Sequence, residues 1–109
     1  MPLPGLEPPK RGAPPTHPGE LLKEIVLPAL KAAGTSRAEV ADLIGMDRTS
    51  FYKLLAAERP VTAELALKLG KLCGNGPDLW LNMQKAWDLE QARASLGDAL
   101  AAIPTLKVA

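Results

Sequence analysis

Residues 36–55, SRAEVADLIGMDRTSFYKLL, decide the fold of this chain because they contain two helix signatures side by side. Ser36 and Glu39 have the S-x-x-E spacing of a capping box, and an apolar stripe follows them until Gly45 interrupts the helix. Asp47 is a typical N-cap residue for a second short helix with its own apolar side. The stretch therefore predicts two short helices joined by a tight turn, which is a helix-turn-helix unit.

Three further helices are predicted around this unit, over residues 18–27, 63–73 and 77–93. The first is expected to end near Leu27 because Pro28 supplies no N–H group to the helical ladder, and Pro28 can begin a further short turn over 29–33 that Gly34 ends. Thr62 is a suitable N-cap for the second, and Pro77 suits the first turn of the third. The pattern predicts an all-α fold, a compact five-helix domain with a central helix-turn-helix.

The composition supports one helical domain with two tails. Only four residues are aromatic, and the seven Val and Ile residues are too scattered to build a sheet. Seven of the eleven prolines lie within the first eighteen residues, where fixed φ angles oppose a packed helix. We therefore expect a flexible Pro-rich tail over 1–16, the helix-turn-helix domain with a C-terminal dimerisation helix over 17–94, and a weakly ordered tail over 95–109.

Positive charge is concentrated in the middle of the chain. Residues 31–71 carry seven cationic and five anionic side chains, whereas the formal charge of the whole chain is only +1. This distribution permits an anionic partner without requiring one.

The outer face of the second short helix carries hydrogen-bonding side chains: Arg48, Thr49, Ser50, Tyr52 and Lys53. In the major groove of DNA an arginine can bond to guanine with two hydrogen bonds, hydroxyls are adaptable, and Lys or Tyr can reach a phosphate or a base edge. This composition favours a recognition helix. The alternative is a polar face that is only solvated, as in many helical bundles.

The helix-turn-helix segment VADLIGMDRTSFYKLL resembles that of the λ-repressor-like (XRE) family, with Ala41 and Gly45 at its small-residue positions. Four other stretches look like the HigA (VapI-related) antitoxins: HPGE at 17–20, PVT at 60–62, LxLGKL at 67–72 and PDLWLNMQ at 77–84. Together these features span roughly residues 17–93.

The HigA resemblance implies two linked functions. One is neutralising a HigB-type toxin that cleaves messenger RNA on the ribosome, and the other is repressing the shared operon by binding double-stranded operator DNA. The resemblance places Arg48, Thr49, Ser50, Tyr52 and Lys53 against the operator. It also implies that Arg37 binds a phosphate together with helix N–H groups, that Arg59 is a weaker phosphate contact, and that Asp47 caps its helix.

A homodimer is expected because proteins of this fold bind paired half-sites. The helix over 77–93 has two apolar faces, more than a small core can cover. The predicted dimer interface comprises Leu79, Met83 and Trp87. Trp80 is equally well explained as a core residue that closes the helical domain.

The remaining reactive residues do not indicate an enzyme. Cys73 lies on an apolar stripe, and His17 beside Pro18 suits a helix start, with no third group to form a catalytic set. We expect no cofactor, no metal site and no catalytic residue. The single cysteine favours a cytoplasmic location, and no apolar run approaches the ~18 residues of a membrane span. A stand-alone XRE repressor without a toxin and a protein-interaction adaptor remain as alternatives.

Overall fold

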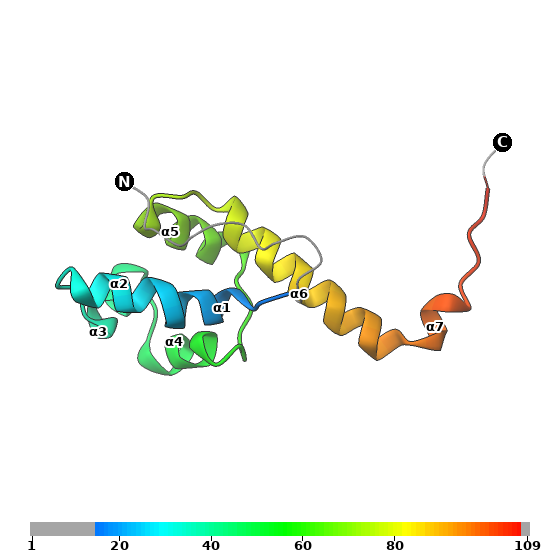
Figure 1. The fold of residues 1–109 in the computed structure, drawn as a ribbon, viewed down its shortest axis with the longest axis horizontal. Coiled ribbons are helices and arrows are strands. Elements are labelled where there is room, and N and C mark those ends of the chain that lie inside the picture. Colours follow the sequence, from blue (N-terminus) through cyan, green and yellow to red (C-terminus); the bar gives the residue numbers. More distant parts are fainter. Residues whose placement is uncertain (1–14, 108–109) are drawn as a thin grey trace.

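The computed structural model describes residues 15–107, and all regular structure within that range is helical. The elements are α1 (Pro18–Leu21), the π-helical segment η1 (Leu22–Val26), α2 (Leu27–Ala32), α3 (Arg37–Leu43), α4 (Arg48–Leu55), α5 (Ala63–Cys73), α6 (Asp78–Leu96) and α7 (Asp98–Ala101). Figure 1 shows α1 to α5 grouped together, with α6 extending away from them. The predicted all-α fold is confirmed.

The first helix continues past Leu27, so the prediction that it ends there is wrong, whereas the further helical turn expected after Pro28 is present. Helical backbone continues from α1 through η1 into α2, where Pro28 lies in the first turn. The N–H of Leu27 bonds to the carbonyl of Leu22, five residues earlier, so the hydrogen-bond register shifts just before the proline. Such a π turn accommodates the missing proline N–H and the crowding of its ring against the preceding turn.

The central helix-turn-helix follows the predicted signals closely. Both hydrogen bonds of the capping box are present, with Ser36 Oγ accepting from the N–H of Glu39 at 3.2 Å and Glu39 Oε1 accepting from the N–H of Ser36 at 3.3 Å. Asp47 caps α4 by accepting from the N–H of Ser50 at 3.2 Å. Gly45 adopts a φ of +69° in the turn, a conformation that favours glycine.

α4 ends in the same hydrogen-bonded motif as α3, but with alanine in the glycine position. Ala57 has a φ of +62°, its N–H donates to the carbonyl of Leu54, and the N–H of Glu58 donates to the carbonyl of Lys53. This is the Schellman arrangement, in which a left-handed residue usually requires glycine. The end of α4 therefore contains a local backbone strain.

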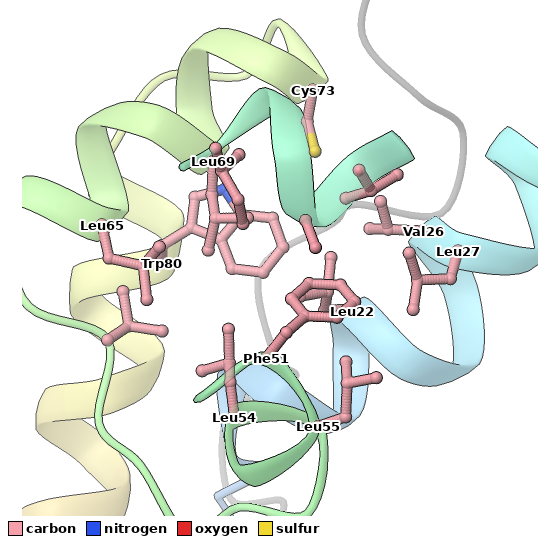
Figure 2. Close-up of a cluster of buried hydrophobic side chains, with 14 of the residues drawn as sticks. Leu22, Val26, Leu27, Phe51, Leu54, Leu55, Leu65, Leu69, Cys73 and Trp80 are labelled. Carbon is pink, nitrogen blue, oxygen red and sulfur yellow. The ribbon is translucent and has the colours of Figure 1, made fainter. Parts of the chain in front are cut away.

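The core lies where the helix-turn-helix meets α1, η1, α5 and the start of α6. Figure 2 shows Phe51 and Leu54 of α4 facing Leu22 and the large indole of Trp80. Leu22, Leu54 and Trp80 are fully buried. Replacing a buried aromatic residue of this size by alanine typically costs about 3–5 kcal/mol, so Trp80 is a major contributor to stability.

Gly19 lets α1 approach the backbone of α4 directly. A Cβ atom at this position would collide with the main-chain carbonyl of Leu54, which cannot move without displacing the end of α4. His17 begins α1 by accepting the N–H of Gly19 on Nδ1 at 2.9 Å. The HPGE segment therefore fixes the position of α4 relative to the rest of the domain.

α6 runs to Leu96, somewhat beyond the expected end near Arg93, and the short helix α7 follows it. The last turns of α6 and all of α7 are exposed, which gives the molecule a long axis of 58 Å against 28 and 24 Å for the other two. Among the described residues, none of the helices is long and apolar enough to cross a membrane.

The strain at Ala57 predicts that Ala57→Gly stabilises the protein. The left-handed conformation costs an alanine about 1–2 kcal/mol, and glycine loses about 0.5–1 kcal/mol through its more flexible unfolded state. We expect a net gain of about 0.5–1 kcal/mol in the free energy of unfolding, measured by urea denaturation.

Ala56→Gly is the matched control, because Ala56 has a φ of −85° and gains nothing from glycine. This variant is expected to lose stability. A loss of stability in both variants would contradict the assignment of strain to Ala57.

Candidate nucleic-acid interface

The 3.6-residue periodicity of α4 places its apolar side chains on one face and its polar side chains on the other. Phe51, Leu54 and Leu55 are buried in the core. Of the five residues predicted to face DNA, Ser50 is half-buried and the other four are exposed. The five are Arg48, Thr49, Ser50, Tyr52 and Lys53. α4 therefore presents two cations and three hydroxyl groups on its outer side.

Arg37, Arg48 and Tyr52 lie around one hollow of about 260 Å³ between α3 and α4. Its other lining residues are Ser36, Ala38, Ala41 and Phe51. Ala41 and Phe51 are buried and form an apolar floor, whereas Tyr52 is 55% exposed at the rim. The helix-turn-helix thus brings three of the predicted site residues, from two helices, to one concave surface.

The capping box engages one of the backbone N–H groups at the start of α3, next to Arg37. We expected its guanidinium to bind a phosphate together with the helix N–H groups, but the N–H of Glu39 already bonds to Ser36. The carboxylate of Glu39 also lies at this end of α3, where it opposes a second anion. Arg37 is exposed, and its binding of a phosphate stays a prediction.

Arg59 is exposed in the segment that follows α4. Hydrogen bonds from Ser50 lower the pKa of Asp47 most, and the positive charge of Arg59 contributes to the same shift. Arg59 therefore adds its charge near the beginning of α4, although it follows that helix in the sequence. Asp47 itself acts as a cap, as predicted.

Lys31 is a cation that the sequence analysis did not assign. It lines a second hollow of about 390 Å³ together with Leu27, Pro28 and Arg37. The helical turn after Pro28 brings Lys31 to the same hollow as Arg37. The cationic surface around α3 is therefore larger than predicted.

Of the residues predicted for the dimer interface, Met83 is buried within its own chain, whereas Leu79 and Trp87 are partly exposed and their role stays a prediction. Met83 is 5% exposed, and Trp80 and Met83 follow the core stripe of α6 at helical spacing. The half-buried ring of Trp87 packs edge-on against His17, with centroids 5.4 Å apart, and Leu79 is also half-buried.

A second face of α6, next to the buried stripe that contains Trp80 and Met83, is open to solvent. A groove of about 640 Å³ runs along it, and the residues that form its apolar and charged surface are Leu81, Lys85, Asp88, Leu89 and Ala92. Val61 and Gln84 line the side of the groove next to the domain, and Asp78 and Asn82 also line it.

Gln84 is the second functional candidate that the sequence analysis missed. It is 6% exposed, its Oε1 accepts from the N–H of Val61 at 2.8 Å, and its Nε2 donates to Asp88 Oδ1 at 2.9 Å. The local sequence pattern does not indicate that Gln84 makes these hydrogen bonds, because the bond to Val61 joins residues 23 positions apart.

The two residues considered for thiol chemistry serve packing and capping. Burial raises the pKa of Cys73 to about 11, so its thiol is held in the neutral, unreactive form. His17 caps α1 and faces Trp87. Within residues 15–107 there is also no group of three or more His, Cys, Asp or Glu side chains placed to hold a metal ion.

A capped helix-turn-helix that exposes cations and hydroxyls on its second helix is the architecture of a DNA-binding helix-turn-helix protein. No protein-family model matches the chain. It is 34% identical over 79 residues to the antitoxin HigA-1 of Vibrio cholerae, covering 72% of this chain and 71% of that protein.

Solved structures agree with this relationship. A HigA-family addiction module antidote protein from Coxiella burnetii superimposes with a TM-score of 0.75 at 32% identity, over 87% of this chain and 100% of that one. The antitoxin GraA in complex with its operator gives a TM-score of 0.72 at 34% identity, over 93% and 99% of the two chains. The chain therefore belongs to the HigA family of antitoxins.

The cap at His17 predicts a pH dependence of stability. Burial lowers the pKa of His17 below its ordinary value of 6.5, and the charges of Asp88 and Glu20 oppose this shift only in part. Above pH 6.5 the histidine is neutral in both the folded and the unfolded chain. As the pH falls below 6.5 the unfolded chain takes up the proton first, so the free energy of unfolding should decrease, by at most about 1.4 kcal/mol per pH unit.

His17→Asn is the matched variant, because asparagine keeps a capping acceptor but does not titrate. Urea unfolding between pH 5 and 8 should show the decrease in the wild-type protein and a flatter profile in His17→Asn. Since the chain has a single histidine, equal slopes in the two proteins would contradict this role for His17.

Proposed function

We propose that this protein is the antitoxin partner of a HigB-type toxin and that it represses its own operon by binding double-stranded operator DNA as a homodimer. The observation that carries the DNA-binding part is the gathering of Arg37, Arg48 and Tyr52 around one exposed hollow of the helix-turn-helix. The structural likeness to GraA in complex with its operator supports operator binding.

α4 is the proposed recognition helix. Arg48 lies in its first turn, from which a guanidinium can bond to a guanine edge in the major groove, and the hydroxyls of Thr49 and Ser50 follow directly. Tyr52 and Lys53 supply longer side chains towards the sugar-phosphate backbone. Arg37, Lys31 and Arg59 are proposed to contact phosphates, which position the protein but do not read the sequence.

The homodimer is proposed to form through the open face of α6. Leu89 is 47% exposed, and Leu81 and Ala92 lie on the same groove. When this helix pairs with a second copy in antiparallel orientation, Lys85 of one copy lies opposite Asp88 of the other, and the contact repeats across the two-fold axis. This self-complementarity favours a symmetric dimer.

Toxin neutralisation is proposed from membership of the HigA family, supported by the likeness to HigA-1 of Vibrio cholerae. A stand-alone repressor shares the same recognition helix, so the decisive observation is a toxin partner. A tagged full-length chain purified from its native cells is expected to carry a small protein in a fixed ratio, identified by intact mass. That protein should stop growth when expressed alone, and co-expression of this chain should restore it.

Recovery of promoter DNA without any such protein would support the stand-alone repressor. Recovery of other proteins with no promoter DNA would support the adaptor alternative and contradict both parts of the proposal.

The two arginines at the hollow are predicted to act differently on DNA. Arg48→Ala should lose about 1–3 kcal/mol of binding to the promoter upstream of its own gene and relax its sequence preference. Arg37→Ala should weaken binding to all sequences and reduce the slope of log K against log salt by about one. Both are measured by fluorescence anisotropy on promoter and scrambled duplexes over a salt series.

Arg93→Ala serves as the control, because Arg93 is an exposed cation on α6 that does not line the hollow. It should leave both affinity and salt slope unchanged. An equal loss on every duplex for Arg48→Ala would remove its assignment as a base-reading residue.

A further inference from the structure

The side chain of Gln84 connects the linker that follows α4, the proposed recognition helix, with the exposed face of α6, the proposed dimer surface. Its carbonyl oxygen accepts from the N–H of Val61, in the linker between α4 and α5. Its amide nitrogen donates to Asp88, on the exposed side of α6. A buried amide with both ends bonded has little freedom to move without leaving a polar group unpaired.

The hydrogen bond from Val61 to Gln84 restrains the end of α4, the proposed recognition helix. Only five residues separate Val61 from Leu55, the last residue of α4, and Val61 is itself 3% exposed. Arg59 and the strained Ala57 lie within this short stretch. Holding the N–H of Val61 therefore restrains the path by which α4 leaves the helix-turn-helix.

The other end of the connection lies in the α6 groove. Val61, Gln84 and Asp88 all line it, together with Lys85 and Leu89. A second copy that places its Lys85 against Asp88 adds a positive charge beside the carboxylate that accepts from Gln84, and that carboxylate has a second oxygen with which to accept it. The occupancy of the groove therefore changes the electrostatic surroundings of the Gln84 side chain.

We infer that Gln84 is a positioning residue that couples self-association through α6 to operator binding through α4. This inference rests on the proposed function, because it takes the operator as the ligand of α4 and a second copy as the occupant of the α6 groove. Docking of the second copy strengthens the existing restraint of Asp88 on Gln84 and of Gln84 on Val61, and the linker then holds α4 more firmly in its binding orientation. By linkage, DNA bound to one protomer must strengthen the dimer by the same factor.

The experiment compares the dimer dissociation constant of the full chain with and without DNA. The DNA is a short duplex carrying one half of the promoter site, so that it contacts one protomer only. Sedimentation equilibrium should show that the saturating half-site duplex tightens the wild-type dimer by about fivefold or more, the lower end of typical coupling factors. In Gln84→Met, which keeps the side-chain volume and removes both hydrogen bonds, the factor should fall below about twofold.

Two further variants separate coupling from folding. Gln91→Met makes the same change at an exposed position of α6 and should behave as the wild type. Gln84→Glu keeps an acceptor for Val61 but sets a carboxylate against Asp88, so it should retain half-site affinity and lose the coupling. A Gln84→Glu protein with the wild-type factor would overturn the inference even where Gln84→Met is poorly folded.

The failure of the inference is distinguishable from that of the proposed function. Wild-type protein that binds the half-site duplex but shows a coupling factor of one overturns the role of Gln84 alone. Wild-type protein that binds no promoter DNA overturns the proposed function and the inference with it.

Discussion

The direct packing of Gly19 against the main-chain carbonyl of Leu54 is the contact on which the rest of the structure depends. It places the end of α4 on the start of α1 with no side chain between them, and Leu22 and Phe51 then close with Trp80 into one core. Asp47 determines where α4 begins, and the Schellman motif at Ala57 determines where it ends. The outer face of α4 is therefore presented on a helix whose position, start and end are each fixed by a separate interaction.

α6 is connected to both sides of α4 and therefore does more than complete the core. Its Trp87 packs on His17, which caps the helix that contains Gly19, and its Gln84 bonds to the linker beyond α4. Asp88 lies between these two connections, bonded to Gln84 and close enough to His17 to affect its pKa. A partner that docks on the open face of α6 thus contacts a residue that bonds to Gln84 and lies near His17.

The elements that sequence analysis predicted well are those with local causes. The capping box at Ser36, the turn at Gly45 and the cap at Asp47 each depend on residues within a few positions, and the exposed face of α4 follows from its periodicity. The failures have tertiary causes. Pro28 does not end its helix because a π turn absorbs it, and alanine at 57 gives no sign of a left-handed backbone. Met83 and Gln84 could be placed only once the partners of α6 were known, because α6 packs against α1 and α5 and Gln84 bonds to Val61, 23 positions away.

The most direct test of this account is an amide-resolved NMR titration of the full chain with a duplex from the promoter upstream of its own gene. A chain of 11.5 kDa is well suited to this measurement. The account predicts that the largest shifts fall on Arg37, Arg48, Thr49 and Tyr52, with smaller changes at Val61 and Gln84 and none in α7. Binding of the duplex that leaves the α3 and α4 amides unchanged would contradict the assignment of this surface as the operator interface.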